Sequence, residues 1–354
     1  MRRLLLLTLF SATTIALLLL NRDRLVLIGI ESVAHRTITA PLAQSLPDGL
    51  HVLLCGAGNP LPDPKRSGPC AAVMAGETII IVDAGSSAAR NLAMFGIRAD
   101  QVDAILITHF HSDHMDGLGE LLLQRWAVGA QTAPTPVHGP QGIEEIVAGF
   151  NLAYLQDTAL RIAHHGAQAM RPEASGGQAV PFATPAAGEM TLVLEQDGLT
   201  VRSFQVDHGP VKPAGGYRFD YKGRSLVISG DTKRSSNLEA LNQDIDLLVH
   251  EAQNAEMVMA INRAAQTAGQ ARLEQIAHDV LDYHTTPVEA AQSAAAINAS
   301  HLLYTHVAPA MPFSFMHDTF TRGVDQVYEG PVTVGEDGTL VLLPADEDEI
   351  EVRK

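Results

Sequence analysis

Residues 108–117 read THFHSDHMDG and follow directly after an apolar run that predicts a buried strand. His109 and His111 are two residues apart, so on an extended chain their side chains point the same way. Asp113 and His114 come next, where the chain turns into a predicted helix. This strand end can therefore direct two imidazoles to one metal ion, and a carboxylate with an imidazole to a second. Neutral imidazole suits zinc, with manganese or iron as alternatives.

Three other predicted strands also end in residues that commonly bind metals, namely His208, Asp231 and His306. Strand ends at one edge of a sheet sandwich share a common rim, so side chains from distant parts of the sequence can meet there. Five imidazoles and two carboxylates are enough for two metal ions, with one carboxylate as a bridge. The predicted ligands are His109, His111, Asp113, His114, His208, Asp231 and His306.

Apolar, β-branched runs alternate with helical patterns from residue 48 to residue 344, which predicts a single α/β domain. The segment 140–190 is helical at first and then rich in glycine, proline and alanine, so we interpret it as an insertion or flap. Residues 345–354 form an acidic tail. The predicted strands are 51–58, 78–85, 104–109, 200–208, 216–221, 225–231, 246–252, 301–306 and 339–344. The predicted helices include 86–95, 115–126, 253–266 and 287–298.

The chain is acidic, with 40 aspartates and glutamates against 24 lysines and arginines and a net charge of -16. Such a surface repels polyanions, so we do not expect nucleic acid as a partner. A small anionic substrate remains compatible, because a bound metal reverses the local field. Cys55 and Cys70 are the two cysteines and form no cluster, which argues against a thiolate metal site. We favour two unpaired small residues, with one short-loop disulfide as the alternative.

The N-terminus carries a targeting signal. Arg2 and Arg3 precede residues 4–20, an uncharged apolar run that is long for a signal peptide and long enough for a tilted membrane span. We therefore expect residues 1–35 to be a signal peptide or a membrane anchor. The catalytic part should lie outside the cytoplasm, in the periplasm or anchored to the membrane. The sequence leaves the oligomeric state open, with a dimer as one option.

The HxHxDH motif at a strand end, followed by His, Asp and His on later strands, resembles the metallo-β-lactamase superfamily. The resemblance extends from about residue 50 to residue 343. The phrases SGDTKRSSNL, LLVHEA and YHTTPVEAA resemble the branch that contains ribonuclease Z and the metal-dependent arylsulfatases. This likeness implies a four-layer αββα sandwich with two zinc ions per chain.

The resemblance also implies how the seven ligands divide between the two metal ions. One zinc ion would be bound by His109, His111 and His208. The second would be bound by Asp113, His114 and His306. Asp231 would bridge the two ions.

Other residues acquire roles from the same resemblance. His284 in YHTTPVEAA matches a catalytic histidine of ribonuclease Z, so we expect it to protonate the leaving oxygen as a general acid. Asp113 belongs to the catalytic motif as well as to the ligand set. His250 in LLVHEA and Asp83 in IIIVDAG are expected to orient a ligand or the acid from outside the ligand set.

Likeness to the arylsulfatase-like subgroup gives the predicted flap a role in binding substrate. Arg161, His164 and His165 lie within the stretch YLQDTALRIAHHG of that segment. We expect these three side chains to contact an anionic substrate above the metals.

These features predict a dinuclear zinc hydrolase that uses a metal-bridged hydroxide on a small, anionic ester, an aryl sulfate or a phosphodiester. A transfer-RNA 3′-processing endoribonuclease and a lactone or carboxylic ester hydrolase are the alternatives. A binding protein with a degenerate site is disfavoured by the complete ligand set. Short-form ribonuclease Z enzymes carry a long basic arm between the third-strand histidine and the bridging aspartate. Here only residues 209–230 separate His208 from Asp231, so we do not expect transfer RNA as the substrate.

Overall fold

The computed structural model describes residues 21–39, 41–345 and 347–354. The chain divides into two compact units, Met1–Leu46 and Pro47–Lys354. The second unit contains every predicted ligand and is the part that the sequence indicates as the catalytic domain.

The described part of the first unit is helical. It consists of helix α2 (Arg22–Thr39) and a short 3-10 helix, η1 (Leu42–Ser45). Among the residues that the structure describes, no helix is both long enough and apolar enough to cross a membrane. The apolar run 4–20 lies outside the described residues, so export or anchoring by this run stays a prediction.

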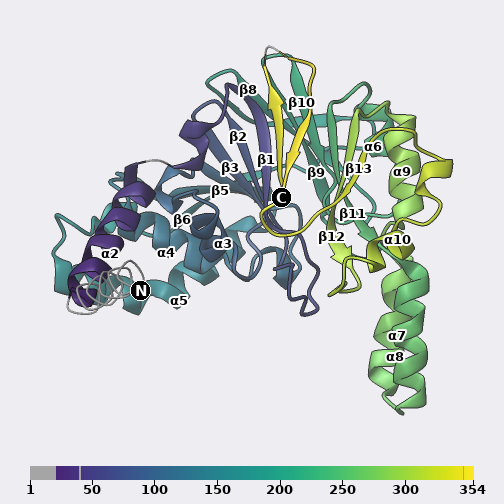
Figure 1. Cartoon of the computed structure of the whole chain (residues 1–354), viewed down its shortest axis with the longest axis horizontal. Coiled ribbons are helices and arrows are strands. Elements are labelled where there is room, and N and C mark those ends of the chain that lie inside the picture. The colour runs from purple at the N-terminus through teal and green to yellow at the C-terminus, as the bar shows by residue number, and fades with distance from the viewer. Residues whose placement is uncertain (1–20, 40, 346) are drawn as a thin grey trace, which may run out of the picture. The chain divides into compact units, whose positions relative to one another are not determined.

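Two mixed sheets stack face to face in the second unit, with helices on the outer face of each (Figure 1). This arrangement confirms the expected αββα sandwich. The outer helices beside the first sheet are α3 (Ala88–Met94), α4 (Leu118–Val128) and α5 (Ile143–His165). Those beside the second sheet are α6 (Ser236–Leu241), α9 (Pro287–Ala296) and α10 (Met316–Phe320). Short 3-10 helices η2 to η6 are Ala99–Gln101, Ser112–His114, Pro172–Ala174, Val280–Asp282 and Val324–Gln326.

Each sheet is antiparallel toward one edge and parallel toward the other. The first sheet has the order β15 (Glu351–Arg353), β14 (Leu340–Pro344), β1 (Gly49–Gly56), β2 (Cys70–Ala75), β3 (Thr78–Val82), β4 (Ala104–Leu106), β5 (Thr135–Pro140) and β6 (Gly177–Phe182). The second has the order β13 (Val332–Val334), β12 (His301–Ala308), β11 (Leu247–Gln253), β10 (Arg224–Ile228), β9 (Gly215–Tyr221), β8 (Leu199–Gln205) and β7 (Met190–Gln196).

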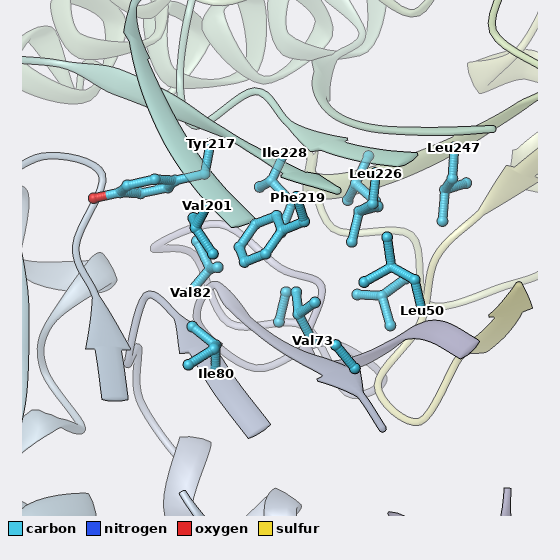
Figure 2. Packing of buried hydrophobic residues seen from close by; sticks show 14 of the residues in the cluster. Leu50, Val73, Ile80, Val82, Val201, Tyr217, Phe219, Leu226, Ile228 and Leu247 are labelled. Carbon is cyan, nitrogen blue, oxygen red and sulfur yellow. The ribbon is translucent and has the colours of Figure 1, made fainter. Parts of the chain in front are cut away.

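The inner faces of the two sheets form the main core. Figure 2 shows Val73 and Ile80 of the first sheet packing opposite Val201, Phe219 and other residues of the second. These side chains are fully buried, which removes their apolar surface from water and stabilises the sandwich. The β-branched runs seen in the sequence thus become strands because one sheet covers the other.

The segment 140–190 differs from the expected flap. Together with the preceding strand β5 it forms a β-α-β unit, in which β5 and β6 pair in parallel and α5 connects them. Asn151 of α5 holds the end of this unit, because its side chain exchanges two hydrogen bonds of 2.9 Å with the backbone of Gly177. The segment is therefore an integral edge of the first sheet. The expected acidic tail likewise contributes a strand, since β15 pairs with β14.

A long helical hairpin projects from the sandwich (Figure 1). It consists of α7 (Ala255–Thr267) and α8 (Ala271–Asp279), and it connects β11 to the segment that carries His284. Asn254 begins α7 by accepting a hydrogen bond from the backbone N–H of Met257 through its side chain. The Asn262 side chain then donates to the Glu274 carbonyl at 2.6 Å and joins the two helices.

Cys55 and Cys70 form a disulfide, so the favoured interpretation of two unpaired cysteines is wrong and the alternative holds. The bond joins β1 to β2 and closes a loop with a sequence separation of 15. Such a link stabilises a fold mainly by restricting the unfolded chain.

We therefore predict that reduction with dithiothreitol lowers the free energy of unfolding by about 3 kcal/mol, the effect of a loop of about 15 residues. Urea denaturation of the oxidised and reduced protein measures the difference. The double variant Cys55→Ala/Cys70→Ala is the control and should not respond to the reductant. Identical urea midpoints for the oxidised and reduced wild type would contradict the prediction.

Candidate metal centre

The candidate site lies where parallel strands end. β3 and β4 are parallel neighbours in the first sheet, and β10, β11 and β12 are parallel neighbours in the second. Carboxyl ends of parallel strands meet at one edge of a sheet and commonly form ligand sites there. His109 and His111 follow β4, His208 follows β8, Asp231 follows β10, and His306 lies within β12.

The structure brings all seven predicted ligands together. Their donor atoms fall into two groups, within each of which every atom lies within 4.8 Å of the others. One group consists of His109, His111, His208 and Asp231. The other consists of Asp113, His114 and His306. The six other ligands divide as the sequence resemblance implies. Asp231, which the resemblance implies to be a bridge, falls in the first group.

Asp231 occupies the centre of the cluster and is 3% exposed. Its Oδ2 atom lies 3.3 Å from Nε2 of both His114 and His306. The same oxygen lies 3.8 Å from Nε2 of both His109 and His208. One carboxylate oxygen therefore faces imidazoles of both groups, which is the placement that a bridging ligand requires.

Hydrogen bonds at the far ring nitrogens fix the orientation of the imidazoles. Nδ1 of His114 lies 2.7 Å from Asp83 Oδ2, and Nδ1 of His109 lies 3.1 Å from the Thr108 hydroxyl. Nδ1 of His208 lies 2.9 Å from the Tyr283 carbonyl. Within the described residues, Nε2 of His109 and of His114 is buried without a hydrogen-bond partner. Buried ring nitrogens without partners are rare in proteins, and here they face the Asp231 carboxylate, so the residues fit a bound cation.

Asp83 lies where its expected orienting role requires. Besides contacting His114, its carboxylate accepts hydrogen bonds from the backbone N–H and the hydroxyl of Thr108 at 2.9 Å each. Its backbone has a positive φ of 58°, an uncommon conformation for a residue other than glycine. The carboxylate thus connects the end of β3 to both ends of the turn 108–114.

The histidines of the cluster differ in the direction of their pKa shifts. Burial lowers the pKa of His109 well below its ordinary value, and burial likewise lowers the pKa of His208. These rings are therefore neutral and able to donate a lone pair. Burial would also lower the pKa of His306, but Asp231 and Asp113 raise it to about 9. Burial would raise the pKa of Asp231, yet His306 and His114 hold it well below the usual range.

His306 reaches the site through a β-bulge. Across the β11–β12 ladder, Glu251 pairs with Thr305 and Ala252 pairs with Val307, so His306 is the extra residue. Its φ of 46° lies in the left-handed region. A bulge of this kind redirects the side chain of the extra residue, here toward Asp113 Oδ2 at 3.3 Å.

His284 lies beside the ligand cluster, with its ring stacked on that of His306 at a centroid distance of 5.5 Å. Its Nδ1 atom lies 2.8 Å from Glu251 Oε1, a contact that the sequence analysis missed. Burial would lower the pKa of His284, but the Glu251 carboxylate raises it above its ordinary value. Glu251 also accepts a hydrogen bond from the Thr232 backbone at 2.9 Å, which fixes the carboxylate in place.

His250 differs from its expected placement. Its ring is fully buried and its Nδ1 lies 2.7 Å from the carbonyl of Glu251. Among the described residues, His250 makes no hydrogen bond to a predicted ligand or to His284. The next residue, Glu251, provides that contact. Successive side chains of a strand point to opposite faces, so a shift of one position selects the other face.

The three flap residues are not brought to the cluster. Arg161, His164 and His165 lie at the C-terminal end of α5, where Arg161 pairs with Asp157 at 2.7 Å. The two histidine rings contact each other edge to face. In the part of the chain that the structure describes, none of the three lines the cavity beside the metal ligands.

Known proteins resemble this chain over most of its length. Ribonuclease Z of Mycolicibacterium paratuberculosis is 33% identical over 298 residues, which cover 84% of this chain and 99% of the relative. Ribonuclease Z of Mycobacterium avium matches to the same extent. The expectation that no nucleic acid is involved is therefore wrong, because these relatives are ribonucleases. It failed because a net charge summed over the chain does not describe the field at a cation-binding site.

Solved structures show the same fold. The metallo-beta-lactamase fold protein YhfI of Bacillus subtilis has a TM-score of 0.59 at 17% identity and covers 83% of this chain and 99% of its own. Human tRNase Z, short form, has a TM-score of 0.58 at 20% identity, with the same coverage of both chains. Residues 65–296 match the family described as the metallo-beta-lactamase superfamily. With this match, the sandwich and the relatives in agreement, the chain belongs to the metallo-beta-lactamase superfamily and is a hydrolase of its ribonuclease Z branch.

Proposed function

We propose that this chain is a dinuclear zinc phosphodiesterase that cleaves the 3′ extension of transfer-RNA precursors. The observation that carries the proposal is the His284–Glu251 pair beside the ligand cluster, in a chain that aligns with 99% of a ribonuclease Z. The pair provides a proton donor where a leaving oxygen needs one. The relatives are ribonucleases, which indicates the bond to be cleaved, a phosphodiester of RNA.

The chemistry of the donor set fits zinc. Imidazole nitrogens and carboxylate oxygens are ordinary zinc ligands, and sites with two ions stabilise both oxygens of a displacement at phosphorus. When bound, zinc ions supply Lewis acidity toward the phosphate and lower the pKa of a coordinated water. The residues that would hold them are His109, His111, Asp113, His114, His208, Asp231 and His306.

The protein supplies the proton for the leaving group. Because Nδ1 of His284 is held by Glu251, Nε2 is the atom left to donate toward the substrate. The carboxylate keeps the imidazole protonated to a higher pH by raising its pKa, although burial acts in the opposite direction. His284 therefore serves as the general acid, and Glu251 positions it.

A small aryl ester is a second candidate substrate. The observation in its favour is a cavity of about 320 Å³ beside the cluster, with a largely apolar lining. Aryl sulfates and aryl phosphodiesters would both place an apolar ring in such a space. The two candidates share the metal ligands and the general acid, so they differ only in what surrounds the scissile bond.

The proposed function predicts the metal content of the protein. The purified chain should bind about two zinc ions, and Asp231→Ala should lose zinc and turnover together because the carboxylate faces both ligand groups. Elemental analysis and an assay with a chromogenic diester measure the two effects. Asp157→Ala on α5 is the matched control and should retain both. Full zinc occupancy together with full activity in Asp231→Ala would refute the bridging role.

The second prediction concerns acid catalysis. His284→Ala should reduce kcat by roughly 10²- to 10⁴-fold for diesters with poor leaving groups, because the leaving oxygen then departs without a proton. The loss should be much smaller for nitrophenyl esters. Glu251→Gln should show a weaker version of the same dependence on the leaving group. His164→Ala is the control variant and should retain the kcat of the wild type.

His284→Ala should retain its zinc. A lower kcat with full zinc content then reports the loss of the general acid rather than damage to the metal centre. An equal loss of kcat on good and poor leaving groups would show that His284 positions the substrate rather than protonating it.

The third prediction tests the substrate. The zinc-loaded full-length chain should cleave a 3′-extended transfer-RNA precursor at the end of the acceptor stem, and a chelator should abolish cleavage. His284→Ala, prepared in the same way, controls for contaminating nuclease. Turnover of aryl sulfates or aryl diesters without cleavage of the precursor would overturn the proposed function and support the second candidate.

A further inference from the structure

We infer that the α7–α8 hairpin forms an apolar wall of the reaction cavity and selects substrates with a flat apolar ring next to the scissile phosphate. The inference rests on the proposed phosphodiesterase chemistry of the site. It assigns to the hairpin a role in substrate specificity that neither the metal ligands nor the general acid can provide.

The cavity connects the hairpin to the reacting groups. On one side it is lined by metal-ligand candidates, including Asp113, Asp231 and His306, and by the general acid His284. The apolar part of its lining comes largely from the hairpin and the adjoining Val280. The apolar residues that carry the argument are Leu61, Val258, Ile261, Leu273, Ile276 and Val280.

Several of these apolar side chains lack a protein cover. Leu273 is 44% exposed and Ile276 is 51% exposed, although both line the cavity from α8. Leu61, in the loop between β1 and β2, lines the same cavity and is 50% exposed. Apolar side chains that face one cavity from two separate segments typically mark a binding site, because a ligand then removes them from water.

The chemistry of the lining identifies the occupant. Among the described residues, no lysine or arginine lines the cavity, so it offers no charged partner for a second phosphate. The metal-ligand residues would hold one phosphate. The other polar residues of the lining are Asn59, Ser112 and Gln253, and the side-chain amides of Asn59 and Gln253 already donate hydrogen bonds to the carbonyls of Val307 and Val280. Tyr283 adds an aromatic ring beside His284, with a centroid distance of 4.8 Å. A flat ring attached to the phosphate ester suits this space better than a sugar or a second anion.

Two kinds of substrate carry such a ring. One is an RNA strand whose unstacked nucleobase adjoins the scissile phosphate, since a base offers an apolar face. The other is a small ester with an aryl group. Both present the same chemistry to the hairpin, so the experiment needs one arm for each.

The binding arm uses two phosphonates that differ only in the ring. Isothermal titration of the zinc-loaded full-length chain should show phenylphosphonate binding about tenfold more tightly than methylphosphonate, the effect of removing part of a phenyl ring from water. In Leu273→Gln/Ile276→Gln this preference should fall to about twofold or less, with methylphosphonate binding unchanged. Glutamine favours helices about as well as these residues do, and both positions are half exposed, so the hairpin should fold.

Leu152→Gln is the matched control. Leu152 is 72% exposed on α5 and does not line this cavity, so the phenyl preference should persist in this variant. Circular dichroism and zinc content of each variant show that fold and metal site are retained. Equal binding of the two phosphonates by the wild type, or an unchanged preference in the double variant, would overturn the inference.

The second arm separates the two sources of the ring. The double variant is compared with the wild type for binding a transfer-RNA precursor with and without the base next to the cleavage site. If the base occupies the cavity, its removal weakens binding to the wild type but not to the variant. If only aryl esters use the cavity, precursor binding is the same in both proteins while the phenylphosphonate preference still differs. Phosphonate binding needs no RNA cleavage, so failure of the proposed function and failure of this inference are distinguishable.

Discussion

The Asp231 carboxylate is the group on which the site depends. One of its oxygens lies within 3.8 Å of four imidazole nitrogens and is almost fully buried. A buried carboxylate without compensation is strongly destabilising, so the histidines around it stabilise the fold as well as the chemistry. Both sheets must therefore keep their strand ends in register, because the imidazoles come from β4, β8 and β12 and the loops that follow them.

Much of this site could be predicted from the sequence, because its signals are local. The HxHxDH motif places four ligands within one strand end and turn, and the later ligands each follow an apolar run. The role of Glu251 could not be predicted in the same way. Every residue of β11 is buried, so the strand shows no alternation of polar and apolar residues to indicate which face meets the cluster. The His306 bulge also leaves no mark in composition.

The errors in the fold prediction have physical causes as well. The segment 140–190 resembles a flap in its sequence because it is rich in glycine, proline and alanine, and the strand it contains, β6, is only half buried at the sheet edge. Edge strands tolerate such residues, since only one side of the strand must form hydrogen bonds. The disulfide forms because β1 and β2 are neighbours in the sheet. The spacing of the two cysteines in the sequence does not determine that pairing of strands. The nucleic-acid expectation failed because net charge averages over the whole chain and does not describe the field at a cation-binding site.

The bulge at His306 places an imidazole at the cluster and costs backbone stability at the same residue. The ladder is continuous through Thr305 and Val307 without this residue, so the pairing of the strands does not need it. A left-handed φ disfavours a histidine by about 1–2 kcal/mol, whereas glycine adopts it freely. His306→Gly would thus relieve backbone strain and remove a ligand in one step. The strain at this backbone position is therefore offset by what the imidazole does in the cluster, where its Nε2 lies 3.3 Å from the buried Asp231 carboxylate.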